Sequence, residues 1–180
     1  MVDRLWLRVA QVVRFVRPGT IEVSPFHAYL TPEAATTFAT LSSGDQQHAL
    51  AVAQRLEANR SPSTLVTAGL LHDIGKAVPG VSVRISDRVA KVLLSKVAPN
   101  RLALMASWER PRWPLGGLWV LSRHARYGGE LVRRWGYPER VAWLVEHHED
   151  HEITDGELAL LIAVDDGRAA DPLTSGIAHG

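Results

Sequence analysis

One stretch of the sequence limits the possible folds more than any other: residues 70–76, Leu-Leu-His-Asp-Ile-Gly-Lys. An apolar, helix-periodic run over residues 61–71 ends there on an imidazole and a carboxylate, and an ammonium follows three residues after the carboxylate. A buried carboxylate beside a histidine is costly unless a positive charge sits between them. The segment therefore predicts a central buried helix whose end holds a metal ion.

Individual residues of this segment predict how the helix begins, packs and ends. Ser61 and Pro62 are expected to begin it with a side-chain cap and a proline at the first helical position. Gly69 would let a neighbouring helix approach closely, and Gly75 is placed to end the helix in a left-handed turn.

Helix-periodic apolar positions recur along the rest of the chain, so we expect an all-α, compact bundle of about seven to nine helices. The expected helices are residues 4–16, one that Thr31 caps and Pro32 begins, 46–58, 61–71, 81–97, 101–108, 118–136, one that begins at Pro138, and 157–164. Residues 21–30 are expected to be extended or irregular. With 180 residues the chain predicts a single domain over 1–180, in which 1–41 form a helical extension packed on the rest and 168–180 a frayed tail.

Composition excludes several classes of protein. The net charge is +1, which gives no reason to expect nucleic acid or an anionic membrane as a partner. No stretch reaches the roughly 18 apolar residues of a membrane span, and the N-terminus does not resemble a signal peptide, so we expect a cytoplasmic protein. Residues 4–16 fit a docking helix better than a basic amphipathic membrane anchor. The chain has no cysteine, so a metal site must use His, Asp and Glu.

Side chains that can bind a metal lie on five of the expected helices, on their apolar faces or at their ends. Ionisable residues seldom take such positions unless they are paired or bind a metal. These residues are His48, His72, Asp73, His124, His147, His148 and Asp165. Asp166 is the alternative to Asp165, which we prefer because it comes first after the apolar run. Five helix faces that meet would supply enough ligands for two metal ions.

The order of His48, His72-Asp73 and Asp165 on hydrophobic helices resembles the HD-domain superfamily of metal-dependent phosphohydrolases. The added His124 and His147-His148 resemble the longer ligand set of its HD-GYP branch, although the glycine-rich loop of that branch does not follow the histidine pair here. The resemblance implies that His48, His72, Asp73 and Asp165 bind one ion. It assigns a second ion to Asp73, His124, His147 and His148, with Asp73 bridging the two.

The resemblance also implies a reaction, in which a metal-activated hydroxide cleaves a phosphoester, for example as a phosphodiesterase acting on a nucleotide. The cofactor would be one or two divalent ions, with two favoured, and imidazole and carboxylate donors suit Fe, Mn, Co, Ni or Zn. Asp73 and Lys76 are the candidate catalytic residues. Lys76 is also the leading contact for the substrate phosphate, and Arg123 and Arg126 are weaker candidates for which a solvated helix face is the competing interpretation.

Two points stay open in the sequence. The protein could instead be a metal-containing, nucleotide-binding signalling module without turnover, or a di-iron oxygenase. The segment 108–117, which contains two tryptophans, two arginines and two prolines, could form a rigid lid over the substrate. Alternatively, it is a cross-connection whose tryptophans fill the core.

Overall fold

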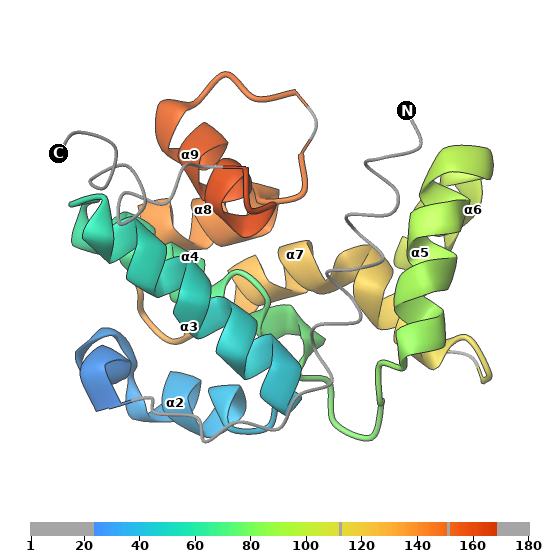
Figure 1. Cartoon of the computed structure of the whole chain (residues 1–180). Helices are drawn as coiled ribbons and strands as arrows, with labels where there is room; N and C mark the ends of the chain where they lie inside the picture. Colours follow the sequence, from blue (N-terminus) through green and yellow to red (C-terminus); the bar gives the residue numbers. More distant parts are fainter. Residues whose placement is uncertain (1–23, 112, 151, 169–180) are drawn as a thin grey trace, which may run out of the picture.

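The computed structural model describes residues 24–111, 113–150 and 152–168. These residues contain eight α-helices and two short 3₁₀ helices (Figure 1). In chain order the elements are η1 (Ser24–Tyr29), α2 (Pro32–Phe38), α3 (Ser43–Ala58), α4 (Ser63–Leu71), η2 (Ile74–Lys76), α5 (Ile85–Val97), α6 (Pro99–Ala106), α7 (Gly116–Arg134), α8 (Glu139–His147) and α9 (Gly156–Asp165). The expected helix over residues 4–16 and the expected tail beyond residue 168 lie outside the described residues.

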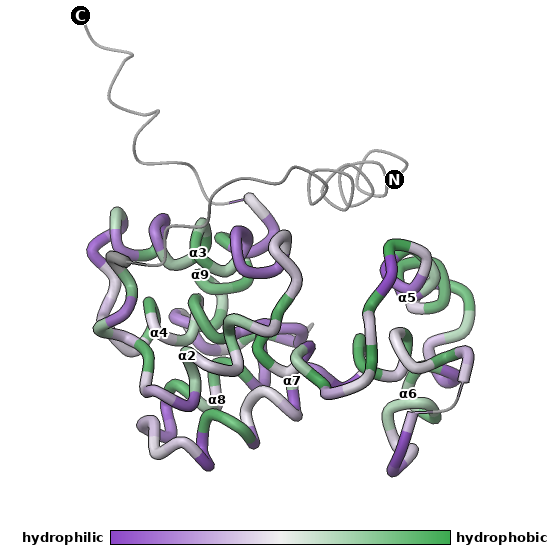
Figure 2. The backbone as a smooth tube through the Cα atoms, turned by 90° about the horizontal axis from the view of Figure 1, so that it is seen from below, coloured by the Kyte–Doolittle hydropathy of each residue, from purple (hydrophilic) through white to green (hydrophobic). Residues whose placement is uncertain are grey.

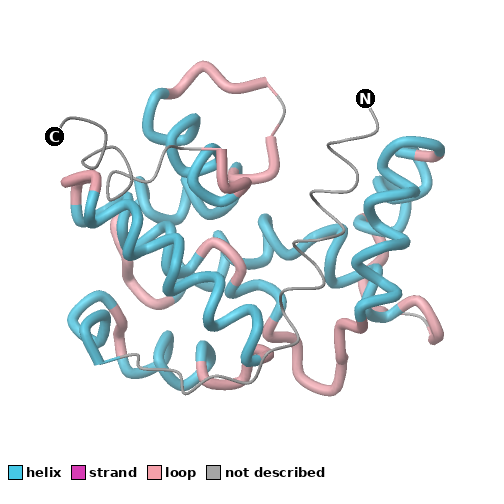
Figure 3. Tube along the Cα trace, viewed as in Figure 1, coloured by secondary structure: helices cyan, strands magenta, loops and turns pink. Residues whose placement is uncertain are grey.

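The prediction of an all-α fold is confirmed, because the described residues form helices and loops without a strand (Figure 3). Thr31 caps α2 through its hydroxyl, and Pro32 takes the first helical position as expected. The expectations for residues 21–30 and for Ser61 were wrong. Residues 24–29 are a 3₁₀ helix rather than an irregular segment, and Phe26 within it is buried in the core. Pro62 is the N-cap of α4 without a side-chain hydrogen bond, so Ser61 does not cap this helix.

Helix α4 lies at the centre of the hydrophobic core. It packs against α3, α8 and α9, and residues 65–71 are all buried. The close approach expected at Gly69 is confirmed, because a Cβ atom there would lie 2.5 Å from Leu56 Cδ1 and 3.1 Å from Val52 Cγ1 of α3. The segment before α3 adds Phe26 and Phe38 to the same core. The end of α4 is thus fixed among the helices that carry the other candidate ligands.

Helices α5 and α6 form an arm that stands apart from this core and packs on the first half of α7 (Figure 2). No residue of α5 is buried, and Leu93 and Val97 on it are half or more exposed. The following segment 108–117 returns the chain to α7. Its Trp113 is 92% exposed, so the alternative in which the tryptophans of this segment fill the core does not hold for Trp113.

The contact between η2 and α7 places the two halves of the candidate site against each other. A Cβ atom at Gly75 would lie 2.0 Å from the His124 carbonyl oxygen and 2.7 Å from the Gly128 amide nitrogen. The expectation of a left-handed turn at Gly75 was wrong, because positive φ among the described glycines occurs at Gly80, Gly136 and Gly167. Gly75 is required because two backbones meet there, whereas Gly136, with φ 78°, ends α7 as predicted.

No helix in the described part of the chain combines the length and the apolar character that crossing a membrane requires.

The contact at Gly75 predicts that Gly75→Ala destabilises the protein by about 3 kcal/mol, because the new methyl group would meet backbone atoms that a side-chain rotation cannot move. Gly156→Ala is the matched control, since a Cβ atom there has no neighbour within 4 Å. Its free energy of unfolding should stay within about 0.5 kcal/mol of the wild type. Urea denaturation of the three proteins measures both effects, and equal stability of the two variants would contradict the prediction.

Candidate metal centre

Six side chains predicted as metal ligands meet where the ends of α4, α8 and α9 approach α3 and α7. They are His48, His72, Asp73, His124, His148 and Asp165. Their elements are separated along the chain but lie side by side in the fold (Figure 1). Because the side chains belong to α3, the turn after α4, α7, the end of α8 and the end of α9, the centre depends on the whole bundle.

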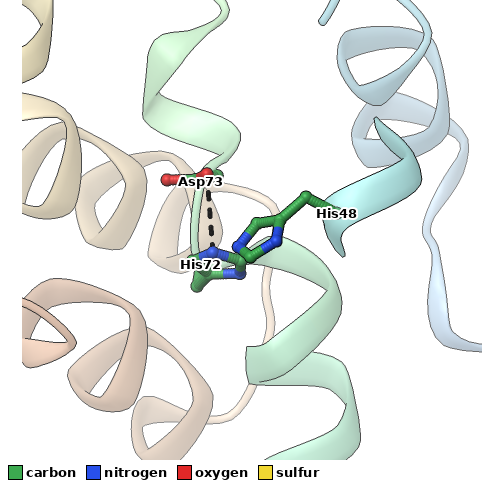
Figure 4. Close-up of side chains that lie close together, drawn as sticks. All are labelled: His48, His72 and Asp73. Atoms are coloured by element: carbon green, nitrogen blue, oxygen red, sulfur yellow. Dashed lines mark ion pairs between the residues drawn. The ribbon is translucent and has the colours of Figure 1, made fainter. Parts of the chain in front are cut away.

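The first group of donors contains His48, His72 and Asp73, whose ligand atoms all lie within 4.8 Å of one another (Figure 4). Asp165 completes this side of the centre. Its Oδ1 atom lies 2.6 Å from His48 Nε2 and 3.4 Å from His72 Nε2. Asp166, the alternative ligand, instead pairs with Arg168 at 2.8 Å. The geometry therefore brings Asp165 to the centre, as the sequence-based preference expected.

The second group contains Asp73, His124 and His148, again with ligand atoms within 4.8 Å of one another, and all three residues are buried. Asp73 Oδ1 lies 3.2 Å from His124 Nε2 and 4.0 Å from His148 Nε2. Its Oδ2 atom lies 3.5 Å from His72 Nε2 in the first group. One carboxylate thus presents one oxygen to each group, which is the arrangement that a ligand shared by two ions requires.

Three of the imidazole rings are oriented by the backbone of their own helices. The Nδ1 atoms of His72, His124 and His148 lie 2.8, 3.0 and 2.7 Å from carbonyl oxygens three residues earlier in the chain. An Nδ1–H that donates to a carbonyl leaves the Nε2 lone pair available, as in many metal-binding histidines. His72 Nε2 is moreover buried without a hydrogen-bond partner in the described structure. This unsatisfied nitrogen, together with the nitrogen and oxygen donors around it, fits a divalent ion.

His147 was grouped with His148 in the sequence, but the structure does not bring it into either donor group. Its ring stacks on Trp143 with the ring centroids 4.6 Å apart, and its Nδ1 lies 2.8 Å from the Trp143 carbonyl oxygen. Successive residues of a helix point about 100° apart, and the buried face of α8, which includes Leu144 and Val145, continues to His148 rather than to His147. At the end of α8, His148 is the one directed inward.

Lys76 lies beside the centre, as predicted. Its Nζ atom is 2.5 Å from Asp73 Oδ2 and 3.4 Å from Asp45 Oδ1. The structure does not bring the two candidate arginines to this place. Arg123 lies over the Trp119 ring and donates to the backbone carbonyl of Trp108 in the segment after α6. Arg126 pairs with Glu130 on an exposed helix face.

Sequence reasoning missed the pairing of Arg88 with Asp45. Asp45 is only 3% exposed, and Arg88 of α5 donates to both of its oxygens at 2.9 and 2.7 Å. Lys91, one turn further along α5, pairs with Glu149, whose Oε2 lies 3.8 Å from His124 Nδ1. The only signal in the sequence was that Arg88 and Lys91 share one face of a helix.

The charges of the centre are coupled in the metal-free protein. Burial alone would raise the pKa of Asp73, but Lys76 and His72 hold it well below its usual value. Burial would lower the pKa of His72, yet the carboxylates of Asp73 and Asp165 raise it to about 9. For His148, burial and then the neighbouring rings of His72 and His124 lower the pKa to about 4, and the carboxylates of Glu149 and Asp73 oppose this shift only in part. Without an ion, His72 therefore supplies one of the positive charges that the carboxylates need.

These shifts predict that the metal-free protein is most stable near pH 6.5, the ordinary pKa of histidine. Stability from protonated His72 is complete below pH 6.5 and is lost as the pH rises through about 9. Stability from neutral His148 is lost as the pH falls from 6.5 toward 4, where the unfolded chain takes up the proton first. On each side of pH 6.5, on the acid limb and on the alkaline limb of the stability curve, the free energy of unfolding should fall by on the order of 3 kcal/mol.

Urea denaturation of chelator-treated protein at pH 5, 6.5 and 9 measures both limbs. His72→Gln should abolish the loss of stability above pH 6.5. The loss below pH 6.5 should persist but become smaller, because burial still lowers the pKa of His148 while the contribution of His72 is gone. A free energy of unfolding that rises between pH 6.5 and 9 in the wild-type protein would contradict the assigned pKa of His72.

Comparison with known proteins agrees with this geometry. No curated protein and no solved structure matches the chain. A family model described as HD domain matches residues 46–175, a range that contains all six side chains of the centre. Members of that family are generally metal-dependent phosphohydrolases. The chain therefore belongs to the HD domain family.

Proposed function

We propose that this protein is a metal-dependent phosphohydrolase that cleaves a phosphoester, with a nucleotide as the favoured substrate class. One observation carries the proposal: Asp73 belongs to both groups of donor atoms, and the Lys76 ammonium lies 2.5 Å from the same carboxylate. A shared carboxylate suits a pair of metal ions, and an adjacent buried cation suits the negative oxygens of a phosphoryl group.

Two ions are proposed to share the centre. His48, His72, Asp73 and Asp165 would hold the first, and Asp73, His124 and His148 the second. The donors are imidazoles and carboxylates, which suit Fe, Mn, Co, Ni or Zn. When bound, such ions polarise a phosphoryl oxygen and make water nucleophilic near neutral pH. His147 is left out of the proposed set because its ring stacks on Trp143.

The chain's own residues would supply orientation and charge. The backbone carbonyls that hold Nδ1 of His72, His124 and His148 fix three ring nitrogens toward the centre before any ligand arrives. Lys76 offsets the Asp73 charge in the metal-free protein, and its ammonium is placed to neutralise charge that develops on the phosphoryl oxygens. Asp73 is buried and the Lys76 side chain is only 10% exposed, so little water screens these interactions.

The first test concerns metal content. Asp73→Asn should remove binding of both ions, because the carboxylate is common to the two groups. His148→Gln should lower the content from two ions toward one, whereas the adjacent His147→Gln should keep both. Native mass spectrometry after loading with Mn or Zn counts the ions. Equal losses in the two histidine variants would contradict the proposed ligand set.

The second test concerns turnover. Mn- or Fe-loaded protein should hydrolyse at least one member of a panel of mono-, di- and cyclic nucleotides and simple phosphoesters. Lys76→Met should lower kcat about 100-fold, the usual cost of removing one group that stabilises transition-state charge. The exposed Lys96 gives the matched control, and Lys96→Met should retain wild-type kcat.

Absence of hydrolysis across the panel, with folded and metal-loaded protein, would refute the proposed reaction. A ligand-induced rise in Tm without turnover would then favour a nucleotide-binding module.

A further inference from the structure

A row of alternating charges connects the α5 arm to the metal centre. Arg88 of α5 contacts Asp45, Asp45 contacts Lys76, and Lys76 contacts Asp73. The first three residues are not metal-ligand candidates in the site described above, and Arg88 comes from a helix with no buried residue. The row therefore gives the arm an electrostatic connection to Asp73.

Asp45 is the residue whose charge must be balanced in this row. It is 3% exposed near the start of α3, and a carboxylate buried to that degree is costly unless it is paired. Ser42 donates to its Oδ2 at 2.5 Å, but a hydroxyl carries no charge. The two cations placed beside Asp45 are Arg88 and Lys76.

The distances show how these cations are divided between the two carboxylates. Arg88 Nη2 lies 2.7 Å from Asp45 Oδ2 and 2.9 Å from Oδ1, whereas Lys76 Nζ lies 3.4 Å from Asp45 Oδ1. Lys76 Nζ is 2.5 Å from Asp73 Oδ2. Arg88 is thus the nearer cation of Asp45, and Lys76 is held mainly by Asp73.

We infer that Arg88 and Asp45 are positioning residues for Lys76. By neutralising Asp45, Arg88 leaves the Lys76 ammonium at Asp73, where the proposed function needs it for the substrate phosphate. Without Arg88, Lys76 is the remaining cation beside the buried Asp45 carboxylate. The uncompensated charge of Asp45 then draws the Lys76 ammonium away from Asp73 and toward Asp45. The inference rests on the proposed function only for the role of Lys76 toward substrate, since its position is independent of any reaction.

The chain is well suited to a direct test, because its three lysines are Lys76, Lys91 and Lys96. Protein with ¹³C-labelled lysine side chains gives three ε-methylene signals in NMR spectra, which Lys→Arg variants assign. Arg88→Met should shift the Lys76 signal and leave that of the exposed Lys96 unchanged. Arg84→Met removes a charge from the exposed start of the same helix and should leave the Lys76 signal as in the wild type.

The double variant Asp45→Asn/Arg88→Met separates positioning from general support of the fold. With the Asp45 charge removed, Lys76 has no competing carboxylate, so its signal should return to the wild-type position. If Arg88 only holds α5 in place, the double variant stays shifted and the Lys91 signal moves as well, and that result would overturn the inference. An unchanged Lys76 signal in Arg88→Met would also overturn it.

If Arg88→Met does not fold, the pair Asp45→Asn and Asp45→Asn/Arg88→Met replaces it. Both contain a neutral residue 45, and the inference requires wild-type Lys76 signals in both. A Lys76 signal that moves when Arg88 is removed from the neutral background would overturn the inference, because Arg88 would then act on Lys76 without Asp45.

Kinetics supply a second readout for an active enzyme. Arg88→Met should lower kcat about tenfold, a usual loss when a residue that orients the groups of a metal site without binding the metal is removed. The double variant should restore kcat. An unrestored kcat in a double variant with a wild-type Lys76 signal would overturn the link between this position and turnover. If the wild-type protein hydrolyses nothing, the proposed function fails while the lysine spectra still decide whether Arg88 positions Lys76.

Discussion

The buried carboxylate of Asp73 is the constraint on which the rest of the structure depends. It lies in the turn between α4 and η2, almost inaccessible to solvent, and an isolated charge there would cost several kcal/mol. Lys76, His72 and His124 surround it with positive charge or hydrogen-bond donors. The same side chains therefore serve metal binding and charge balance. A bound ion would take over the compensating positive charge that the histidine protons and the Lys76 ammonium supply in the metal-free protein.

Backbone packing puts these partners in reach of Asp73. Gly75 allows η2 to lie directly against α7 at the His124 carbonyl, and this contact sets His124 Nε2 3.2 Å from Asp73 Oδ1. Gly69 likewise lets α4 approach α3, the helix that carries His48. Both glycines serve the same purpose. Because neither has a side chain, a neighbouring helix can pack directly against the backbone, and this close packing brings a histidine to the centre.

Much of the site was predictable from sequence because its residues stand at conspicuous positions. His72, Asp73 and Asp165 each end an apolar helix, and His48 lies on a periodic apolar face, so the spacing of apolar residues is enough to infer their burial. The sequence-based prediction assigned both His147 and His148 to the second ion, because adjacent histidines at a helix end are separated only by the rotation of α8 about its axis. In the structure the face of α8 that packs into the core holds Val145 and, one turn on, His148. His147 therefore lies outside this buried face and stacks on Trp143 of the same helix.

Arg88 was unpredictable for a different physical reason. The apolar periodicity of residues 81–97 indicated a helix that the structure forms over Ile85–Val97, yet Leu93 is 50% and Val97 77% exposed, and no residue of α5 is buried. What ties α5 to the centre is its charged face, where Arg88 meets Asp45 and Lys91 meets Glu149. Hydrophobic periodicity indicates which face of a helix is apolar. It does not indicate which face packs against the rest of the protein when a buried carboxylate on another element requires a cation. In this chain the need to neutralise the buried Asp45 accounts for the side of α5 that faces the metal centre, and Lys91 adds an ion pair with the exposed Glu149 on the same side.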